Sequence, residues 1–289
     1  MERPGSPERP GVIDIHTHMA WMEGCRPGFL AFMSATLGEP FEGFMRRHRG
    51  PESFLKVMDE NVVDRAVVLS EHSPATTGIA SHEQLLDYCS ASPRLIPFAN
   101  VNPYQVHRPG REFEALLKRG VKGLKLCPTY QFFYPNDRML YPMYAAAEEA
   151  GAPVLVHTGT SMFPGARLKY GDPLYLDDVA VDFPDLRLGM CHGGRGFWYR
   201  EAFTLLRLHE NLYIDTAGLP PHKLLDYYPE LERCADRFLF GTDWPGLPRP
   251  RTIAQNVSTV RALDISPEAR DQILAGNALR FLGQNVAAV

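Results

Sequence analysis

The sequence contains no apolar run that approaches the roughly 20 residues needed by a membrane-spanning helix, so no membrane partner is expected. No cluster of Lys and Arg resembles a polybasic patch and the formal net charge is −4, which gives no electrostatic footprint for nucleic acid. Neither a GxGxxG turn nor a Walker-type loop is present, so the phosphate-binding signature of a doubly wound sheet is missing. These absences leave a small molecule as the expected partner.

Cysteine is scarce and scattered along the chain. The five cysteines are odd in number and show no CxxC spacing, which argues against a disulfide framework and favours free thiols. We therefore expect a reducing compartment, the cytoplasm. Residues 1–10, MERPGSPERP, are rich in proline and lack the apolar core of a signal peptide, so a disordered tail is expected there.

Short β-branched runs alternate with helix-like stretches through most of the chain. Continuous apolar strands separated by amphipathic helices indicate a parallel sheet that is buried on both faces. A closed (β/α)8 barrel, the TIM barrel, accounts for the number of strands and for residues 11–289 as a single α/β domain. The final stretch, 267–282, is expected to be a helix on the outside of this barrel. The eight expected strands are 12–15, 64–69, 95–100, 121–126, 153–157, 186–191, 212–215 and 238–241.

Side chains that bind metals or transfer protons follow several of the predicted strands. In a barrel the carboxyl ends of the strands meet at one mouth, where active sites form. His16 and His18 are separated by one residue, so on a strand they share a face. A single histidine at a strand end is more often structural than a ligand, but the shared position of the whole set favours a metal site. The residues are His16, His18, Lys125, Cys127, His157, His192 and Asp243.

The residue types in this set indicate a divalent metal. Imidazole nitrogens with one carboxylate suit zinc, with manganese, iron and cobalt as alternatives, and a catalytic site keeps one position open for water. We expect His16, His18 and His157 to supply nitrogen ligands. Asp243 is expected to be a ligand or to accept the proton of a metal-activated water. His192 is expected to polarise a substrate oxygen or to donate a proton.

In sequence the motifs resemble the amidohydrolase superfamily, and more narrowly its amidohydrolase-related branch, which includes aminocarboxymuconate-semialdehyde decarboxylase. The resemblance runs from about residue 11 to residue 283. It implies a distorted (β/α)8 barrel and a metal bound by residues matching the two histidines of the HxH motif, the histidine of VLVHTG and the aspartate of FGTDWP. The histidine of MCHGG matches a residue that acts in catalysis beside the metal. In this chain the residues are His16, His18, His157, Asp243 and His192.

Two positions depart from what related sequences show. Relatives that share the KGLKL strand often continue into His-Pro, whereas this chain has Cys127 before Pro128. Cys127 is then either a thiolate ligand or, as we favour, a small buried residue beside the site. Some two-metal members of the superfamily bridge their metals with a carboxylated lysine on the fourth strand, where this chain has Lys125. The simpler expectation is that Lys125 helps to bind a substrate carboxylate.

Two long loops are expected at the mouth of the barrel, at 19–49 and 159–173, where most connections of this kind have about 2–6 residues. Such loops form lids and pockets. Among the residues near the mouth, cationic side chains suit an anionic group of the substrate and aromatic side chains suit an apolar body. The expected substrate-binding residues are Lys125, Arg195, Lys169, Trp21 and Phe163.

Two enzyme functions fit this sequence. The leading one is a metal-dependent hydrolase that cleaves an ester, lactone or amide bond of a small, carboxylate-bearing molecule with a metal-activated water. The alternative is a metal-dependent non-oxidative decarboxylase of an aromatic or unsaturated acid. Some decarboxylating relatives carry Glu where this chain has His16, which favours the hydrolase. A non-catalytic scaffold predicts an eroded ligand set, which is not seen, and a homo-dimer or higher homo-oligomer is compatible with the sequence.

Overall fold

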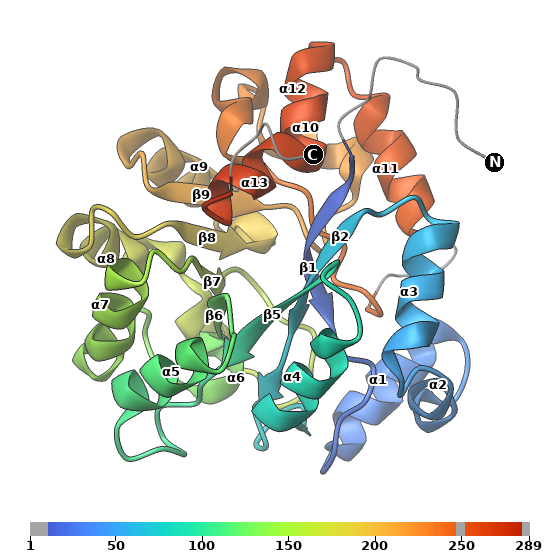
Figure 1. Cartoon of the computed structure of the whole chain (residues 1–289). Coiled ribbons are helices and arrows are strands. Elements are labelled where there is room, and N and C mark those ends of the chain that lie inside the picture. Colours follow the sequence, from blue (N-terminus) through green and yellow to red (C-terminus); the bar gives the residue numbers. More distant parts are fainter. Residues whose placement is uncertain (1–10, 247–251, 285–289) are drawn as a thin grey trace.

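The computed structural model describes residues 11–246 and 252–284, which form a barrel of parallel strands surrounded by helices (Figure 1). The expected tail at residues 1–10 lies outside the described residues. The strands follow one another around the barrel in the order β1-β2-β5-β6-β7-β8-β9-β10, which confirms the predicted TIM barrel. They are β1 Ile13–His18, β2 Arg65–Leu69, β5 Leu95–Asn100, β6 Gly123–Leu126, β7 Val154–His157, β8 Leu188–Cys191, β9 Leu212–Asp215 and β10 Phe238–Leu239.

The barrel closes where β1 meets the segment that follows β10. Three backbone hydrogen bonds cross this seam: Ile15 N–H donates to the Phe240 carbonyl at 2.9 Å, and His18 N–H to the Trp244 carbonyl at 2.7 Å. The third runs from the Asp243 N–H to the carbonyl of His16 at 2.9 Å. The first strand and the end of the last strand therefore lie side by side, although more than two hundred residues separate them in sequence.

Helices cover the outside of the barrel, and their first residues show why they begin where they do. Proline occupies the first turn of α3, α5 and α12, where its missing N–H costs nothing, and Ser81 closes a capping box with Gln84 at the start of α4. None of the helices in the described part of the chain is long and apolar enough to cross a membrane. The helices are α1 Pro27–Leu37, α2 Phe41–Arg47, α3 Pro51–Glu60, α4 His82–Ser90, α5 Pro109–Lys118, α6 Pro128–Gln131, α7 Tyr141–Glu149, α8 Leu176–Asp182, α9 Tyr199–Leu208, α10 Leu224–Tyr227, α11 Ile253–Arg261, α12 Pro267–Asp271 and α13 Asn277–Phe281.

The C-terminal segment closes one end of the barrel. A π-helical turn, Gln272–Gly276, joins α12 to α13, and α13 packs against inward-facing side chains such as Ile13 and Leu155 rather than only on the outside. The ring of Phe281 lies 5.1 Å from that of Tyr213 near the start of β9. The predicted helix is present as α12, the π-helical turn and α13, and its C-terminal part fills the amino end of the barrel rather than lying on the outer surface.

The opposite, carboxyl end carries most of the additional structure. The long connection after β1 contains α1 and α2, which lie beyond the carboxyl end of β1 (Figure 1). A two-stranded hairpin, β3 Glu71–His72 with β4 Ile79–Ala80, follows β2.

All five cysteines are free thiols, as predicted.

Candidate metal centre

Three of the predicted ligands meet at the seam of the barrel. The Nε2 atoms of His16 and His18 lie 3.3 Å apart, and the Asp243 carboxylate lies 3.5 Å and 3.2 Å from them, respectively. The two histidines come from the carboxyl end of β1, and Asp243 follows β10 across the seam. Asp243 has a left-handed backbone with φ of 66°, a conformation that costs energy in a residue with a side chain and that gathers at functional sites. These three side chains form a group whose ligand atoms could hold one metal ion.

A buried carboxylate fixes the orientation of the His16 ring. Nδ1 of His16 donates to Oδ2 of Asp215, at the end of β9, over 2.5 Å, and both side chains are almost fully buried. Burial, reinforced by the nearby Lys125 ammonium, lowers the pKa of His16 well below its usual value, so the imidazole is neutral. A neutral ring with its proton on Nδ1 has an unprotonated Nε2, which is the form that binds metals.

His157 is held in the same ligand-ready form by a second chain of hydrogen bonds. The Ala217 carbonyl can only accept, so Nδ1 of His192, 2.7 Å away, carries the proton. Burial lowers the pKa of His192 and of His157, so both rings are neutral. Nε2 of His192 then accepts from Nδ1 of His157 at 3.1 Å, which leaves an unprotonated Nε2 on His157. That nitrogen is buried and has no hydrogen-bond partner in the described structure.

The unpaired nitrogen of His157 supports a ligand role, although its distance from the other groups is larger. Among the described residues, two groups of His, Cys, Asp or Glu side chains could hold a metal ion, and neither group includes His157 or Cys127. The second group consists of His16, Cys191 and Asp215. His157 nevertheless lines the same cavity as His16, His18 and Asp243. The donor set fits a divalent metal, because buried imidazole lone pairs without partners are costly unless something binds them.

Lys125 points into the barrel interior. Its ammonium lies 2.9 Å from the Cys191 sulfur and 3.4 Å from Nε2 of His16, and the side chain is 1% exposed. Cys127 is buried, lies within 3.5 Å of the Asn100 amide nitrogen, and has a pKa raised by burial. This setting agrees with a neutral thiol beside the site, the reading that we favour for Cys127.

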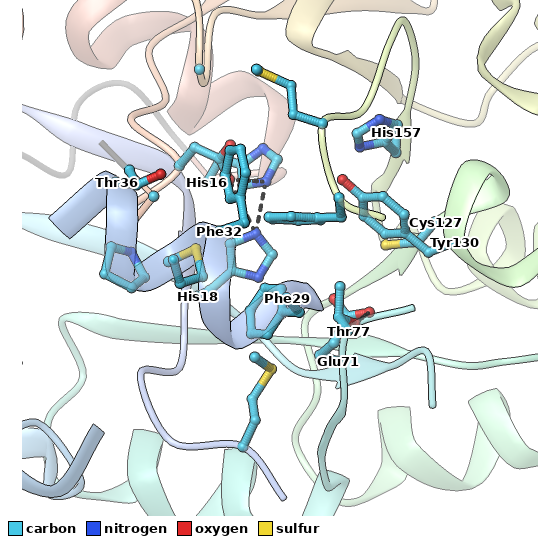
Figure 2. Close-up of a pocket in the computed structure, with 18 of the residues that line it drawn as sticks. His16, His18, Phe29, Phe32, Thr36, Glu71, Thr77, Cys127, Tyr130 and His157 are labelled. Atoms are coloured by element: carbon cyan, nitrogen blue, oxygen red, sulfur yellow. Dashed lines mark hydrogen bonds and ion pairs between the residues drawn. The ribbon is translucent and has the colours of Figure 1, made fainter. Parts of the chain in front are cut away.

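A cavity of about 360 Å³ opens beside these residues and contains part of the expected substrate-binding set (Figure 2). Lys125, Arg195 and Phe163 line it, whereas Trp21 and Lys169 do not. Trp21 lies under the guanidinium of Arg49, and Lys169 lies over the ring of Tyr170. The lining is largely apolar, and much of it comes from the connection after β1 and from α1 and α2: Met19, Met22, Phe29, Phe32, Met33 and Phe41.

Arg195 reaches the cavity next to Asp243. A Cβ at Gly218 would lie 2.5 Å from the Arg195 guanidinium, 3.2 Å from the Asp243 carboxylate and 3.3 Å from His192, so this glycine leaves room for the three to converge. Burial opposes ionisation of Asp243, but the hydrogen bond with His18 and the positive charge of Arg195 outweigh it and hold its pKa below the usual value. Asp243 is therefore an ionised carboxylate at neutral pH.

Sequence reasoning missed two carboxylates in this region. Asp215 ends the motif LYID on β9, and its position at a strand end was the available signal. Glu71 follows β2 and is 4% exposed in the cavity wall, although it lies on a two-residue strand that no periodicity can reveal. Both residues bear on the chemistry of the site.

A family model described as amidohydrolase matches residues 13–284. The chain belongs to the amidohydrolase family. This confirms the resemblance inferred from the HxH, VLVHTG, MCHGG and FGTDWP motifs, including the branch that contains decarboxylases.

Solved structures similar to this amidohydrolase span nearly its whole length. An uncharacterised TIM-barrel protein from Bordetella bronchiseptica is 26% identical, with 94% of this chain and 98% of that chain covered and a TM-score of 0.75. 5-Carboxyvanillate decarboxylase from Sphingomonas paucimobilis is 17% identical over 96% and 100%, with a TM-score of 0.69. A probable 2-pyrone-4,6-dicarboxylic acid hydrolase from Acinetobacter baumannii is 16% identical over 94% and 99%, with a TM-score of 0.67. At the identities of the last two, the likeness concerns the fold.

Proposed function

We propose that this member of the amidohydrolase family is a metal-dependent hydrolase that cleaves an ester, lactone or amide bond in a small, carboxylate-bearing molecule. The observation that carries the proposal is that an ionised Asp243 carboxylate lines one cavity with His16 and His157, two neutral rings that each keep an unprotonated Nε2. Hydrolysis needs a base beside the position of the attacking water, and Asp243 is suited to that role. The free thiols support a cytoplasmic location.

His16, His18, His157 and Asp243 are the proposed metal ligands. Nitrogen donors with one carboxylate favour zinc, with manganese, iron or cobalt as alternatives. A divalent ion held there would supply Lewis acidity and lower the pKa of water. Asp215 and His192 keep the rings of His16 and His157 in the tautomer that exposes Nε2.

The remaining residues have roles that follow from their contacts. Asp243 accepts the proton of the attacking water and returns it to the leaving group. Arg195 lies beside Asp243 and suits a substrate carboxylate, and Lys125 adds a second positive charge deeper in the barrel. His192 is the second catalytic candidate. Because its Nε2 accepts from His157, it reaches the substrate only by exchanging that contact.

Non-oxidative decarboxylation of an aromatic or unsaturated acid is the second candidate. The apolar lining of the cavity supports it, because aromatic rings such as Phe29 and Phe163 suit the flat body of an aromatic acid. Similar solved structures also include 2,6-dihydroxybenzoate decarboxylase with 2,6-dihydroxybenzoate, at 19% identity. In this reading Asp243 or His192 would protonate the carbon that loses carbon dioxide.

Two measurements test the proposal. Metal analysis of the purified protein is expected to find close to one equivalent of a divalent metal, and chelation is expected to abolish turnover. A panel of carboxylate-bearing lactones, esters and amides, set against hydroxybenzoates, is then scored for acid release and for carbon dioxide release. Acid release supports the hydrolase and carbon dioxide release supports the decarboxylase. A protein that is inactive on both panels after loading with zinc or manganese would refute both functions.

A further inference from the structure

Glu71 is a buried carboxylate in the cavity wall that the roles above do not use. It is 4% exposed and lines the same cavity as His18 and Lys125. Thr77 donates a hydrogen bond from Oγ1 to Oε1 of Glu71 at 3.0 Å, and the two residues lie together below Phe29 in Figure 2. Within residues 11–246 and 252–284, no ion pair forms with this carboxylate.

The hydrogen bonding of Glu71 is incomplete. A carboxylate offers about four acceptor positions, whereas Thr77 has a single hydroxyl proton to donate. The Ser73 carbonyl, 3.5 Å from Oγ1 of Thr77, is a second acceptor for the same proton. Oε2 of Glu71 has no hydrogen bond to the described residues, although the residue borders the cavity. A carboxylate oxygen without a donor in an apolar cavity is costly, and a cavity occupant with a donor group removes that cost.

The cavity therefore has two polar ends with opposite requirements. Arg195 lies beside Asp243 and His192, at the end that suits an anionic group. Glu71 comes from β3, on the other side of Phe29 from His16 in Figure 2, and suits a donor. The aromatic side chains that line the same cavity are Phe29, Phe32, Phe41, Tyr130 and Phe163.

We propose that Glu71 is a specificity-determining residue that binds a hydrogen-bond donor on the substrate, a protonated amine in preference to a hydroxyl. The substrate is then an apolar or aromatic molecule with its reacting group at the histidine end and an amino group at the Glu71 end. The proposal rests on the proposed function only for the statement that the histidine end is where the bond is cleaved.

Two small probes test Glu71 without using the reaction. 4-Methylbenzylamine and 4-methylbenzyl alcohol have nearly the same shape, and neither has a carboxylate or a cleavable bond. In calorimetric titrations of the full-length protein at pH 7.5, the amine is expected to bind at least about tenfold more tightly than the alcohol, because a charge-assisted bond forms in a buried site. Equal binding of the two probes, or binding of neither, would overturn the proposal, and this comparison needs no variant.

Three variants assign the preference to one carboxylate. Glu71→Gln keeps the shape and is expected to lose about tenfold or more of the amine affinity and less than about threefold of the alcohol affinity. Thr77→Val removes the hydroxyl partner and keeps the carboxylate, so the amine preference is expected to remain. Asp243→Asn removes the other cavity carboxylate and is expected to leave amine binding within about threefold; loss of amine binding there, with none in Glu71→Gln, contradicts the proposal.

Activity separates this proposal from the proposed function. If the amine preference is present and depends on Glu71 while no ester, lactone or amide is cleaved, the hydrolase is wrong and the donor site stands. If esters are cleaved and the amine preference is absent, the donor site is wrong and the hydrolase stands.

Discussion

Replacement of Asp215 by asparagine tests the claim that this carboxylate sets the tautomer of His16. The Ala217 N–H donates to Oδ1 of Asp215 at 2.8 Å, so an asparagine keeps its oxygen at that position. Its NH2 group then faces Nδ1 of His16, from which Asp215 accepts a hydrogen bond over 2.5 Å. Nδ1 becomes the acceptor and the ring proton moves to Nε2, which can no longer bind a metal.

The expected loss is near the upper end of what such partners contribute to metal affinity. Outer partners of metal-binding histidines are worth about 10- to 100-fold in affinity, or about 1.4–2.7 kcal/mol. Asp215 and His16 are 0% and 1% exposed, so no solvent replaces the lost acceptor. Burial, against the opposing charge of Lys125, also raises the pKa of Asp215 to about 7, so zinc affinity is compared at a pH above that value. We expect zinc affinity to fall about 100-fold in Asp215→Asn.

Zinc affinity is measured by competition with a chromophoric chelator at pH 7.5. Asp177→Asn is the matched control, because Asp177 accepts from Nε2 of His209 at 2.6 Å on the exposed surface, and neither residue lines the cavity. Thermal unfolding of the metal-free proteins shows whether either change disturbs the fold. Zinc affinity of Asp215→Asn within twofold of the unsubstituted protein, with the fold intact, would refute the reasoning.

Three further predictions concern other parts of the chain. Gly193→Ala places a Cβ about 2.1 Å from the Tyr228 hydroxyl oxygen at a φ of 52°, so the free energy of unfolding is expected to fall by about 1–3 kcal/mol. Adding Tyr228→Phe is expected to restore part of this loss, and unchanged denaturant midpoints would contradict the prediction. Burial raises the pKa of the Cys25 thiol to about 11, so about one thiol in a thousand is ionised at pH 8. The reaction of Cys25 with a disulfide reagent is therefore expected to be more than about 100-fold slower than that of free cysteine, and its rate is expected to rise up to pH 11. His157→Asn is expected to lose the metal, measured by elemental analysis, whereas His192→Asn is expected to keep most of it and lose turnover; an active His192→Asn variant would remove that residue from the reaction.

Most of the barrel could be predicted because its strands are continuous apolar runs with turn signals between them. The 95–100 and 212–215 segments coincide with β5 and β9, and other strands differ by a residue or a few at their ends. The β3–β4 hairpin could not be predicted, because two-residue strands carry no periodicity. The place of α13 was also missed, since an amphipathic helix that fills the end of a barrel has the same pattern as one that covers its outside.

The candidate site was predictable as far as strand ends could be counted. His16, His18 and Asp243 were expected together and lie together, because parallel strands deliver their carboxyl ends to one mouth. Lys169 and Trp21 were placed near the mouth by loop position alone, and loops fix no direction for a side chain. Glu71 was not found, because its position depends on how the β2 connection folds back over the cavity.

The seam between β1 and the end of β10 ties the proposed ligand set to the opening motions of the barrel. His16 and His18 lie on one side of this junction and Asp243 on the other, so any fluctuation that parts the two edges also pulls the ligands apart. A bound ion would hold the two edges of this seam together, and its occupancy would report how often the barrel opens there. Amide hydrogen exchange at Ile15, His18 and Asp243 would then slow on metal loading, while amides in the β5–β6 wall would keep their rates.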